Sequence, residues 1–587
     1  MKTAIKDIEK YAVEFKRHFW SYLLIFLSLD LFNQYLMLPL FYFLNTYIFQ
    51  AVSVPFSSLQ YVVTIVTYHP FLCLLLLIEL FFLLWLLYIE FSFLLIGISD
   101  ICNGSNLKIY FKRIWQIIKT PNITELLLIL MYLLLLEPIV EVIFRTPLLS
   151  RVKMADFIFD YMTRTPILVV ILIIFYILFI FLGIRLMFVL PKMILKREKF
   201  TDAITESWQI TKNGQWWDFV SNILVLLLFS IVLLFATYFI CYSLQIIWDI
   251  FPRQFSFIMA NVDLFLIQLA SLLGLACFIW IDSLILLKPL SLKFKKYNGK
   301  SNQRKLLFTV AALFLLSSLV VIDNNSSYLN NSSLKRPLLI SHRGVSDKNG
   351  VQNTLPVLRK TAKMKPDLVE MDIHETKDNK FVVLHDANLN KLTRINNKPG
   401  QLTLRELTKL TARENGHKAK ITSFGYYLKI AESLKQKLLV EIKTTPTDSL
   451  DMLQLFNRRY GKTILKRHYQ IHSMDYRVVT GLHKINPKLS VFYIQPYNFT
   501  YPRNVAAGYS MEFSTLNYDF IKQAHQQGKL VYVWTVDNPN VMKKMLYDHV
   551  DGLITNNLEE AKAAVRQYEH NLSYANYLLN YIMTIPI

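Results

Sequence analysis

The chain has 587 residues, of which 53% are hydrophobic and 18% charged, and its formal net charge is +22. This length excludes one ordinary domain, and the uneven spread of apolar residues excludes a chain that is soluble throughout. Residues 1–322 carry apolar runs close to the ~20 residues that a helix needs to cross a ~30 Å hydrocarbon core, whereas 335–568 has the composition of a soluble domain. The Asn- and Ser-rich stretch 323–334 between them is typical of a flexible linker.

The positive charge is concentrated in the C-terminal part of the chain. Residues 334–587 hold 37 Lys and Arg against 22 Asp and Glu, a net charge of +15. A basic domain joined to membrane segments favours a membrane lipid or an anionic cell-surface polymer as its partner. No nucleic acid is expected, because no recognition motif or aromatic stacking pattern accompanies the charge. All four cysteines lie in the N-terminal part, so disulfides do not stabilise the C-terminal part.

Seven apolar segments predict a multi-pass α-helical membrane domain over residues 1–322. The predicted spans are 19–44, 69–97, 122–144, 166–190, 217–243, 262–287 and 305–322. The first span is long and has no small-residue cleavage site, so we expect it to remain as an anchor. A moderately apolar stretch at 50–68 is the candidate for an eighth crossing.

The distribution of Lys and Arg between the spans predicts their orientation. Five basic residues precede the first span, and 98–121, 191–216 and 288–305 hold four, five and seven, so we expect these segments on the cytoplasmic side. The last span then places everything after it at the outer face of the cell membrane. The segment 145–165 opposes this arrangement, because it is assigned outside but carries four basic residues.

Five acidic residues fall within these spans or at their margins, namely Asp30, Glu79, Glu90, Glu125 and Glu137. A charged side chain at the centre of a span costs roughly 2.5–3.5 kcal/mol on insertion scales, so such residues often mark function. Pairing near the membrane interface is the alternative. The pattern leaves open a lipid-handling membrane protein to which the C-terminal domain is an accessory.

Polar side chains gather at the ends of predicted strands in the C-terminal part. They follow or alternate with short apolar runs at 338–341, 368–373, 381–384 and 438–442. The groups concerned are His342, Arg343, Glu370, Asp372, His385, Glu441 and Lys443. Strands alternate with helices over the ~230 residues that follow, which predicts an α/β TIM-type (β/α)8 barrel, and such barrels place catalytic groups at the C-terminal ends of their strands.

The remaining predicted elements continue the same alternation. Helices are predicted at 403–410, 424–435, 518–527, 539–547 and 558–568, and strands at 469–473, 489–494, 511–515, 529–536 and 551–555. Residues 569–587 form an apolar C-terminal tail, for which packing on the barrel and contact with the bilayer surface are both open.

The residue types at the strand ends suit metal-assisted chemistry on a phosphoester. Glu370 and Asp372 lie on one face of an apolar strand, where they repel each other unless a cation compensates, and Ca²⁺ and Mg²⁺ prefer carboxylate oxygens. Arg343 can donate two parallel hydrogen bonds to a phosphate. His342 and His385 on either side of the carboxylate pair suit a general acid and a general base.

In this order the motifs resemble those of the glycerophosphodiester phosphodiesterase family. The matching motifs are His342-Arg343-Gly344, Asn353-Thr354, Glu370-Met371-Asp372, His385-Asp386, Glu441-Ile442-Lys443, Val533-Trp534-Thr535-Val536 and Val550-Asp551-Gly552-Leu553-Ile554-Thr555. A lone His-Arg-Gly is a weak signal, whereas the ordered series is specific. The N-terminal part is similar to the multi-span domain that precedes the barrel in some bacterial members.

The resemblance implies a phosphoric diester hydrolase that depends on a divalent metal cation, Ca²⁺ or Mg²⁺, and releases glycerol 3-phosphate and an alcohol. It implies that Glu370, Asp372 and Glu441 bind the metal, that His342 and His385 are general base and general acid, and that Arg343 and Lys443 hold the phosphate. Gln352, Asn353 and Trp534 are candidate pocket residues. In family members the glycerol hydroxyl next to the phosphate is thought to attack phosphorus, and water then opens the cyclic intermediate.

Two positions depart from the family pattern. Gln352 stands where the family usually has Glu, and Asn556 stands where Asp is common. The change at Gln352 leaves open a non-hydrolytic module that binds or senses glycerophosphodiesters. For an enzyme at the outer face of the membrane, the candidate substrates are a lipid headgroup, a lysophospholipid or a polyglycerol-phosphate polymer, and the leaving alcohol is undetermined.

Overall fold

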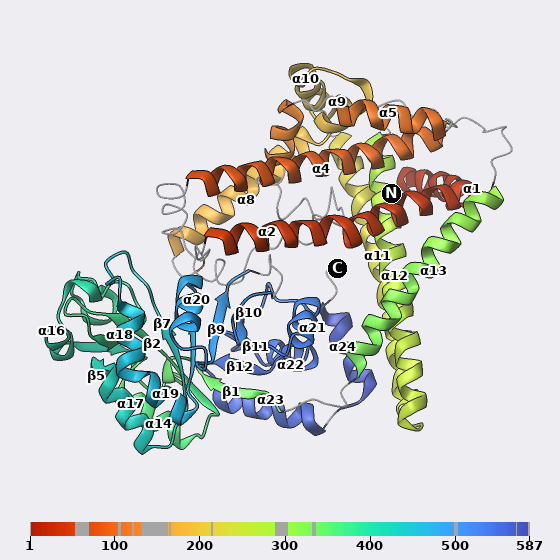
Figure 1. Ribbon diagram of the computed structural model, residues 1–587. Coiled ribbons are helices and arrows are strands. Elements are labelled where there is room, and N and C mark those ends of the chain that lie inside the picture. Colours follow the sequence, from red (N-terminus) through yellow and green to blue (C-terminus); the bar gives the residue numbers. More distant parts are fainter. Residues whose placement is uncertain are drawn as a thin grey trace. The chain divides into compact units, whose positions relative to one another are not determined.

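The computed structural model describes most of the chain and divides it into two compact units (Figure 1). The described residues are 2–52, 70–103, 107–119, 123–131, 163, 166–212, 215–287, 303–330, 336–497, 503–570 and 572–584. One unit comprises residues 1–40, 74–330 and 581–587, and the other comprises 41–73 and 331–580.

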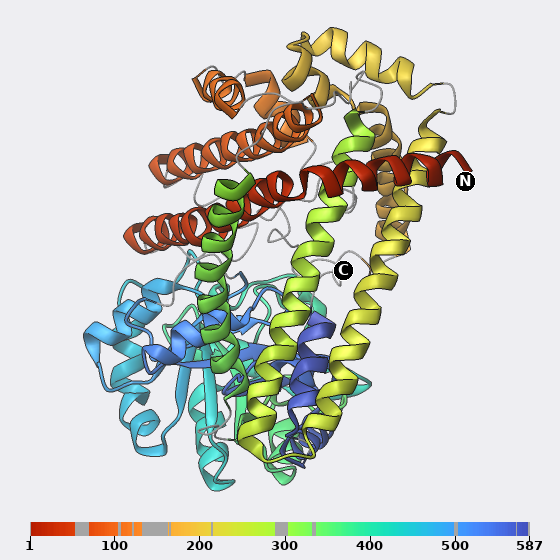
Figure 2. The ribbon, with the colours of Figure 1, turned by 90° about the vertical axis from the view of Figure 1, so that its right-hand side faces the viewer.

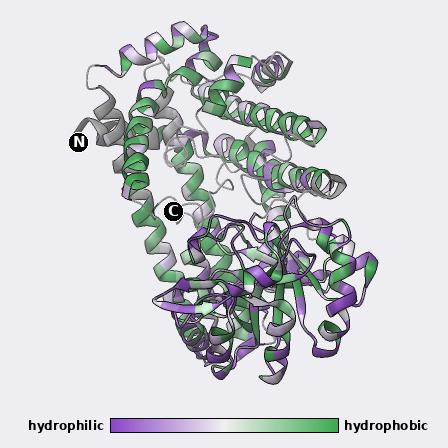
Figure 3. Cartoon of the chain, turned by 90° about the vertical axis from the view of Figure 1, so that its left-hand side faces the viewer, coloured by the Kyte–Doolittle hydropathy of each residue, from purple (hydrophilic) through white to green (hydrophobic). Residues whose placement is uncertain are grey.

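The N-terminal part consists of helices. They are α1 (Lys2–Phe32), η1 (Asn33–Met37), α2 (Leu38–Val52), α4 (Pro70–Asn103), α5 (Leu107–Lys119), α8 (Pro166–Leu186), α9 (Val189–Lys196), α10 (Phe200–Ile210), α11 (Gln215–Trp248), α12 (Arg253–Leu287) and α13 (Gln303–Leu329). Colouring by hydropathy shows the long helices as predominantly apolar (Figure 3). Helices α11 and α12 pack side by side along most of their length (Figure 2).

Six helical segments among the described residues are long and apolar enough to cross a membrane. They are Phe15–Ile48, Pro70–Asn103, Pro166–Lys196, Ile231–Trp248, Arg253–Trp280 and Arg304–Leu329. Each overlaps one of the seven predicted spans. The remaining span, 122–144, and the candidate crossing at 50–68 lie mostly outside the described residues, so the count of seven stays a prediction.

The last of these helices corrects the predicted linker. Helix α13 continues to Leu329, so the prediction of a flexible linker was wrong for residues 323–329. The Asn325 side chain exchanges two amide hydrogen bonds with Gln268 of α12, at 2.8 and 2.9 Å, and the Ser326 hydroxyl donates to Asn261 at 3.0 Å. These partners satisfy polar side chains that would otherwise favour a loop.

The C-terminal part folds as a closed barrel of eight parallel strands (Figure 1). The strands are β1 (Leu338–Ser341), β2 (Leu368–Glu375), β7 (Leu438–Ile442), β8 (Gln470–Ser473), β9 (Val491–Gln495), β10 (Gly508–Glu512), β11 (Leu530–Trp534) and β12 (Gly552–Thr555). Strand β1 pairs with both β12 and β2, which closes the ring. The predicted fold class, a multi-pass helical domain followed by a TIM-type barrel, is confirmed.

Helices lie between most successive strands of the barrel, and a further helix, α23, follows the last strand. They are α14 (Leu355–Lys363), α17 (Phe424–Ser433), α18 (Met452–Phe456), η6 (Asn457–Gly461), α19 (Lys462–Arg467), α20 (Tyr476–Ile485), α21 (Tyr518–Gln526), α22 (Pro539–Tyr547) and α23 (Leu558–His570). Side-chain oxygens cap several of them; Asn517, for example, accepts from the backbone of Phe520 at the start of α21.

An excursion of about fifty residues interrupts the alternation between β2 and α17. It contains β3 (Phe381–Val383), α15 (Asn390–Thr393), η5 (Pro399–Gln401), α16 (Leu404–Lys409), the hairpin of β4 (Thr411–Glu414) and β5 (His417–Lys420), and β6 (Thr422–Ser423). Strand β3 runs antiparallel to the extended end of β2 and pairs with β6. The sequence patterns predicted α16 but not the hairpin.

The predicted strand at 511–515 lies three residues too far along the chain, because β10 begins at Gly508. A Cβ atom at Gly508 would lie 2.3 Å from the Phe492 ring of the neighbouring strand, so the pairing of β10 with β9 needs glycine at this position. Glycine is uncommon in strands, which is why the pattern pointed to the residues after it.

The apolar tail forms helix α24 (Tyr574–Thr584). Its Tyr577 is fully buried and packs edge-on against Tyr547 of α22, with ring centroids 4.9 Å apart. The hydroxyl of Tyr577 lies 3.3 Å from that of Tyr568 on α23. The first part of the tail therefore packs on the outside of the barrel.

Candidate active site

The inward face of the barrel changes from apolar to charged along each strand. Near the strand starts it is filled by a cluster formed by Ile340, Leu368, Leu439, Phe492, Tyr532 and Ile554. Two residues further on, the same faces carry His342, Glu370 and Glu441, because inward positions repeat every second residue. The C-terminal ends of the strands thus bring polar groups together above this apolar cluster.

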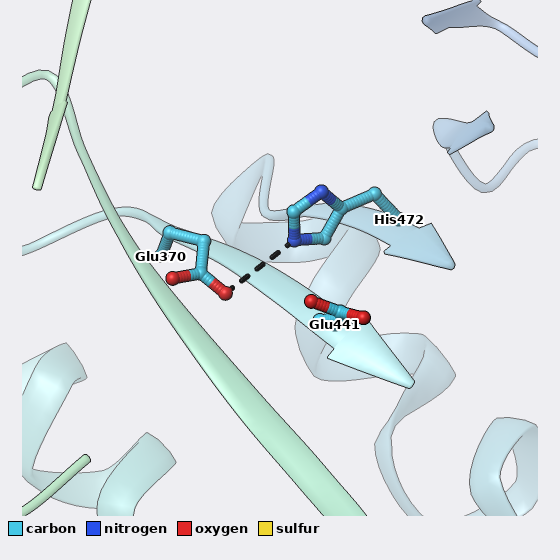
Figure 4. Close-up of side chains that lie close together, drawn as sticks. All are labelled: Glu370, Glu441 and His472. Atoms are coloured by element: carbon cyan, nitrogen blue, oxygen red, sulfur yellow. Dashed lines mark ion pairs between the residues drawn. The ribbon is translucent and has the colours of Figure 1, made fainter. Parts of the chain in front are cut away.

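The register of three neighbouring strands sets a row of inward side chains. Asp372 of β2 is the partner of Glu441 of β7, which in turn is the partner of His472 of β8. Glu370 lies two residues before Asp372 on the same face of β2. Figure 4 shows Glu370, Glu441 and His472 directed toward one another.

Backbone and amide groups orient the two carboxylates of β2. The backbone N–H of Arg343 donates to Glu370 Oε2 at 2.7 Å. The side chain of Asn353 donates to Asp372 Oδ2 at 2.8 Å and accepts from the Asp372 backbone at 3.0 Å. Asn353 has a φ of 59°, a left-handed conformation that Asn tolerates better than most residues. These bonds fix where the carboxylate oxygens point.

Lys443 lies between two of the carboxylates. Its Nζ is 2.6 Å from Glu441 Oε1 and 3.1 Å from Asp372 Oδ1. Burial opposes the charge on Lys443, but these two neighbours outweigh it and raise its pKa to about 12. Burial likewise disfavours the charge on Asp372, yet Lys443, His385 and Arg343 hold the pKa of that carboxyl well below its usual range. Burial raises the pKa of Glu441 to about 7.

His342 belongs to a chain of hydrogen bonds that fixes its tautomer. Asp537 accepts from the backbone N–H of Asn556 and from its side-chain Nδ2, both at 2.7 Å. The amide oxygen of Asn556 is therefore turned toward His342, whose Nδ1 lies 3.0 Å away. Since that oxygen can only accept, His342 Nδ1 carries the proton and Nε2 is the basic nitrogen. Burial, reinforced by the Arg343 guanidinium, lowers the pKa of His342 well below 6.5.

His385 has a different partner. Its Nδ1 lies 2.9 Å from Asp386 Oδ1, and its backbone oxygen lies 3.1 Å from Nε2 of the buried His374. Burial, with Lys443 acting in the same direction, lowers the pKa of His385 to about 4, although Asp386 favours the charged ring. One histidine of the site thus faces a neutral amide, and the other faces a carboxylate.

Gln352 connects Arg343 to the β4–β5 hairpin. Its side-chain oxygen accepts from Arg343 Nη1 at 2.7 Å, and its Nε2 donates to Glu414 Oε1 at 2.6 Å. The backbone N–H of Gln352 also donates to Glu414 Oε2, at 2.9 Å. An amide can accept from the arginine and donate to the carboxylate with one side chain, whereas an ionised carboxylate at this position could only accept.

Trp534 is the last residue of β11. Its side chain is half-buried and packs against the apolar layer, while its indole N–H donates to the carbonyl oxygen of Ser510 at 3.0 Å. Trp534 therefore lies between the apolar cluster and the polar C-terminal ends of the strands.

The donor set fits a divalent cation. Three buried side chains form this set: Glu370, Glu441 and His472. One potential ligand atom from each of them, a carboxylate oxygen or an imidazole nitrogen, lies within 4.8 Å of the other two. Asp372 is not in this cluster, since Lys443 and Asn353 occupy its two oxygens. Burying several carboxylates with one lysine leaves a negative excess that a cation would offset.

Two family models account for nearly the whole chain. Residues 8–322 match the membrane domain of glycerophosphoryl diester phosphodiesterase, and residues 342–560 match the glycerophosphoryl diester phosphodiesterase family. The chain belongs to this family. It is an enzyme, a glycerophosphodiester phosphodiesterase, and a multi-pass membrane protein.

Similar proteins match the barrel part of the chain. A glycerophosphodiester phosphodiesterase of Caldanaerobacter subterraneus is 25% identical over 245 residues, 40% of this chain and 99% of the relative. One of Bacillus subtilis is 26% identical over 278 residues, 43% of this chain and 94% of the relative. A solved phosphodiesterase of Oleispira antarctica in complex with the product sn-glycerol-3-phosphate has 18% identity and a TM-score of 0.34, covering 39% of this chain and 97% of that one.

The structure brings together all seven residues predicted for catalysis, metal and phosphate, and it adds residues that the sequence patterns of this phosphodiesterase did not reveal. The added residues are His374, Glu414, His472 and Asp537. The sequence offers little indication of these residues. His472 lies in a predicted strand, but its place beside Glu441 follows only from the pairing register of β7 and β8. Glu414 belongs to the hairpin that no pattern predicted.

We predict that Gln352→Glu detaches the β4–β5 hairpin. The change places a carboxylate against that of Glu414 and removes the donor between them, at a cost of roughly 1–3 kcal/mol. Trypsin should then cleave the native protein faster after Arg413 and Lys418, which lie in the hairpin. The double variant Gln352→Glu, Glu414→Gln restores a donor and should restore protection, whereas equal cleavage of all three proteins would contradict this role of Gln352.

Proposed function

We propose that this phosphodiesterase is anchored in the cell membrane, depends on a divalent cation and hydrolyses glycerophosphodiesters to glycerol 3-phosphate and an alcohol at the outer face. The observation that carries the proposal is the pair of half-buried histidines beside the buried carboxylates: His342 lies against a neutral amide, and His385 lies against a carboxylate. Membership of the family supplies the reaction, and the geometry supports a role for each group.

Glu370 and Glu441 hold the cation, with Asp372 beside them. When bound, the cation offsets the charge of the diester and stabilises the charge that develops on its oxygens. Ca²⁺ and Mg²⁺ are the ions expected for the carboxylates alone. Asn353 and the Arg343 backbone keep the carboxylates oriented, as supporting groups commonly do around metal ligands.

Arg343 and Lys443 hold the phosphate. Lys443 is a partly buried, charged group against the carboxylates, and Arg343 is held by Gln352 through one Nη nitrogen. Two fixed cations in a site of low polarity stabilise additional negative charge on the phosphoryl oxygens without reorganising during the reaction.

The partners of the two histidines assign their roles. His342 faces a neutral amide and carries its proton on Nδ1, so its Nε2 suits a general base. Asp386 favours the protonated ring of His385 and so opposes the effect of burial on its pKa, which makes His385 the better suited of the two histidines to deliver a proton as general acid. In the first step, His342 takes the proton of the glycerol hydroxyl next to the phosphate as its oxygen attacks phosphorus. His385 gives a proton to the departing alcohol, and water then opens the cyclic phosphate with the roles reversed.

The leaving group is proposed to be a polar alcohol. An open hollow is lined by Asp386, Asn388, Asn390 and Lys391. Asp386 is also the hydrogen-bond partner of His385, the proposed proton donor to that alcohol. Polar lining favours a hydroxylated group, such as a glycerol headgroup or the next unit of a polyglycerol-phosphate polymer, over an acyl chain. The basic charge of residues 334–587 supports an anionic membrane surface or polymer as the partner.

We predict that the full-length protein releases glycerol 3-phosphate from glycerophosphoglycerol and that EDTA abolishes this release. His342→Ala should lower kcat/KM at least ~100-fold, because a positioned base contributes about 10²–10⁴-fold. His417→Gln, at an exposed position of the hairpin, is the control and should retain activity. Metal-independent release, or full activity of His342→Ala, would overturn the proposal.

We predict that exchanging the two groups behind His342 moves the acid limb of the pH profile. The double variant Asn556→Asp, Asp537→Asn places the carboxylate next to Nδ1, which favours the imidazolium and raises the pKa of His342 by about one unit or more. The base is then lost at a higher pH, so the acid limb of kcat/KM should shift upward. Asp537→Asn alone adds no charge there and is the control; an unshifted limb in the double variant would contradict His342 as the base.

We predict that the barrel faces outward. The described part of the barrel contains no cysteine, so Lys466→Cys at the exposed end of α19 gives a unique label there. A membrane-impermeant maleimide should label this variant on intact cells as fully as after permeabilisation. Lys466→Ser retains only the four native cysteines and sets the background. Labelling that requires permeabilisation would place the barrel on the cytoplasmic side.

A further inference from the structure

In the group formed by Glu370, Glu441 and His472, the histidine is the member that no sequence pattern assigned to the metal. It is 3% exposed, and among the described residues neither of its ring nitrogens has a hydrogen-bond partner. A buried polar group left without a partner typically costs ~1–3 kcal/mol, so such a group in a native structure calls for a reason.

The position of the ring supplies that reason. His472 Nε2 lies 3.6 Å from Glu370 Oε1, which is longer than a hydrogen bond (Figure 4). Two ligands of one ion at ~2.0–2.2 Å, separated by tetrahedral or octahedral angles, lie about 3–3.6 Å apart. The other oxygen of Glu370 is already held by the Arg343 backbone, which leaves Oε1 toward the imidazole.

The strand register makes this arrangement rigid. His472 and Glu441 are direct partners in the parallel pair of β7 and β8, so their Cβ atoms leave the sheet on the same side. Both lie on strands, and strands hold ligands more precisely than loops do. We therefore propose that His472 is a ligand of the catalytic cation, together with Glu370 and Glu441.

A nitrogen ligand changes which ion the site prefers. Mg²⁺ and Ca²⁺ take oxygen ligands, whereas an imidazole with two carboxylates suits Zn²⁺ and related transition-metal ions. His472 accordingly shifts the preference of this enzyme toward Zn²⁺ and away from the ions expected for a set of three carboxylates. This inference rests on the proposed metal dependence, and it concerns the ligand set and the choice of ion.

The test measures metal binding directly on the full-length protein in detergent after removal of metal with a chelator. Zn²⁺ affinity is measured by competition with a chromogenic chelator, Mg²⁺ and Ca²⁺ affinity by calorimetry, and Co²⁺ serves as a coloured substitute for Zn²⁺. We expect His472→Gln to weaken Zn²⁺ binding by at least about 10–100-fold, while Mg²⁺ affinity changes little. The visible spectrum of bound Co²⁺ should change in the same variant.

Two further variants keep the inference falsifiable. His483→Gln, at an exposed position of α20, is the matched control and should leave Zn²⁺ affinity and the Co²⁺ spectrum unchanged. His472→Asp supplies an oxygen ligand, so it should raise the Ca²⁺ affinity relative to Zn²⁺, and it also serves if the Gln variant does not fold. Unchanged Zn²⁺ affinity and Co²⁺ spectrum in a folded His472 variant would overturn the inference and leave metal dependence intact. A wild-type protein that binds none of these ions would overturn both.

Discussion

The burial of three carboxylates inside the end of a closed barrel is the constraint around which the site is built. Glu370, Asp372 and Glu441 are each less than a tenth exposed. Removing such charges from water costs several kcal/mol for each ion unless partners compensate. Lys443 compensates two of them directly, while burial raises the pKa of Glu441 to about 7 in spite of this lysine.

The same constraint explains the two amides that replace family carboxylates. Gln352 and Asn556 each stand where the family commonly has an acid, and each is bonded to a carboxylate one step further out, Glu414 and Asp537 respectively. In this chain the carboxylates of Glu414 and Asp537 lie behind the amides, and the amide oxygens accept from Arg343 and His342. Gln352 therefore supports the arginine and gives no reason to expect a barrel that binds without hydrolysing.

The sequence was sufficient for the fold class, and it pointed to the residues that the structure brings together at the strand ends, because both depend on local patterns. Alternating apolar and charged residues at Glu370–Asp372 and Glu441–Lys443 indicate strands with one charged face, and the ordered motifs indicate the family. Residues brought in by tertiary structure escaped detection. His472 depends on the β7–β8 register, and Glu414 depends on a short hairpin whose strands have exposed, charged faces. The polar end of α13 was mistaken for a linker because its partners lie on another helix.

Closure of the barrel determines why His342 differs from His385. Strand β1 is paired with β12 at the other end of the domain sequence, which brings His342 next to Asn556, more than two hundred residues later. His385 instead takes its partner from the adjacent residue Asp386, so its environment needs only the local excursion after β2. The partner that fixes the His342 tautomer is therefore supplied by the end of the last strand, whereas the partner of His385 is its neighbour in the chain. The tautomer of His342 thus depends on closure of the ring, because loss of the β1–β12 pairing would separate His342 from Asn556 and from Asp537, which holds Asn556 in place.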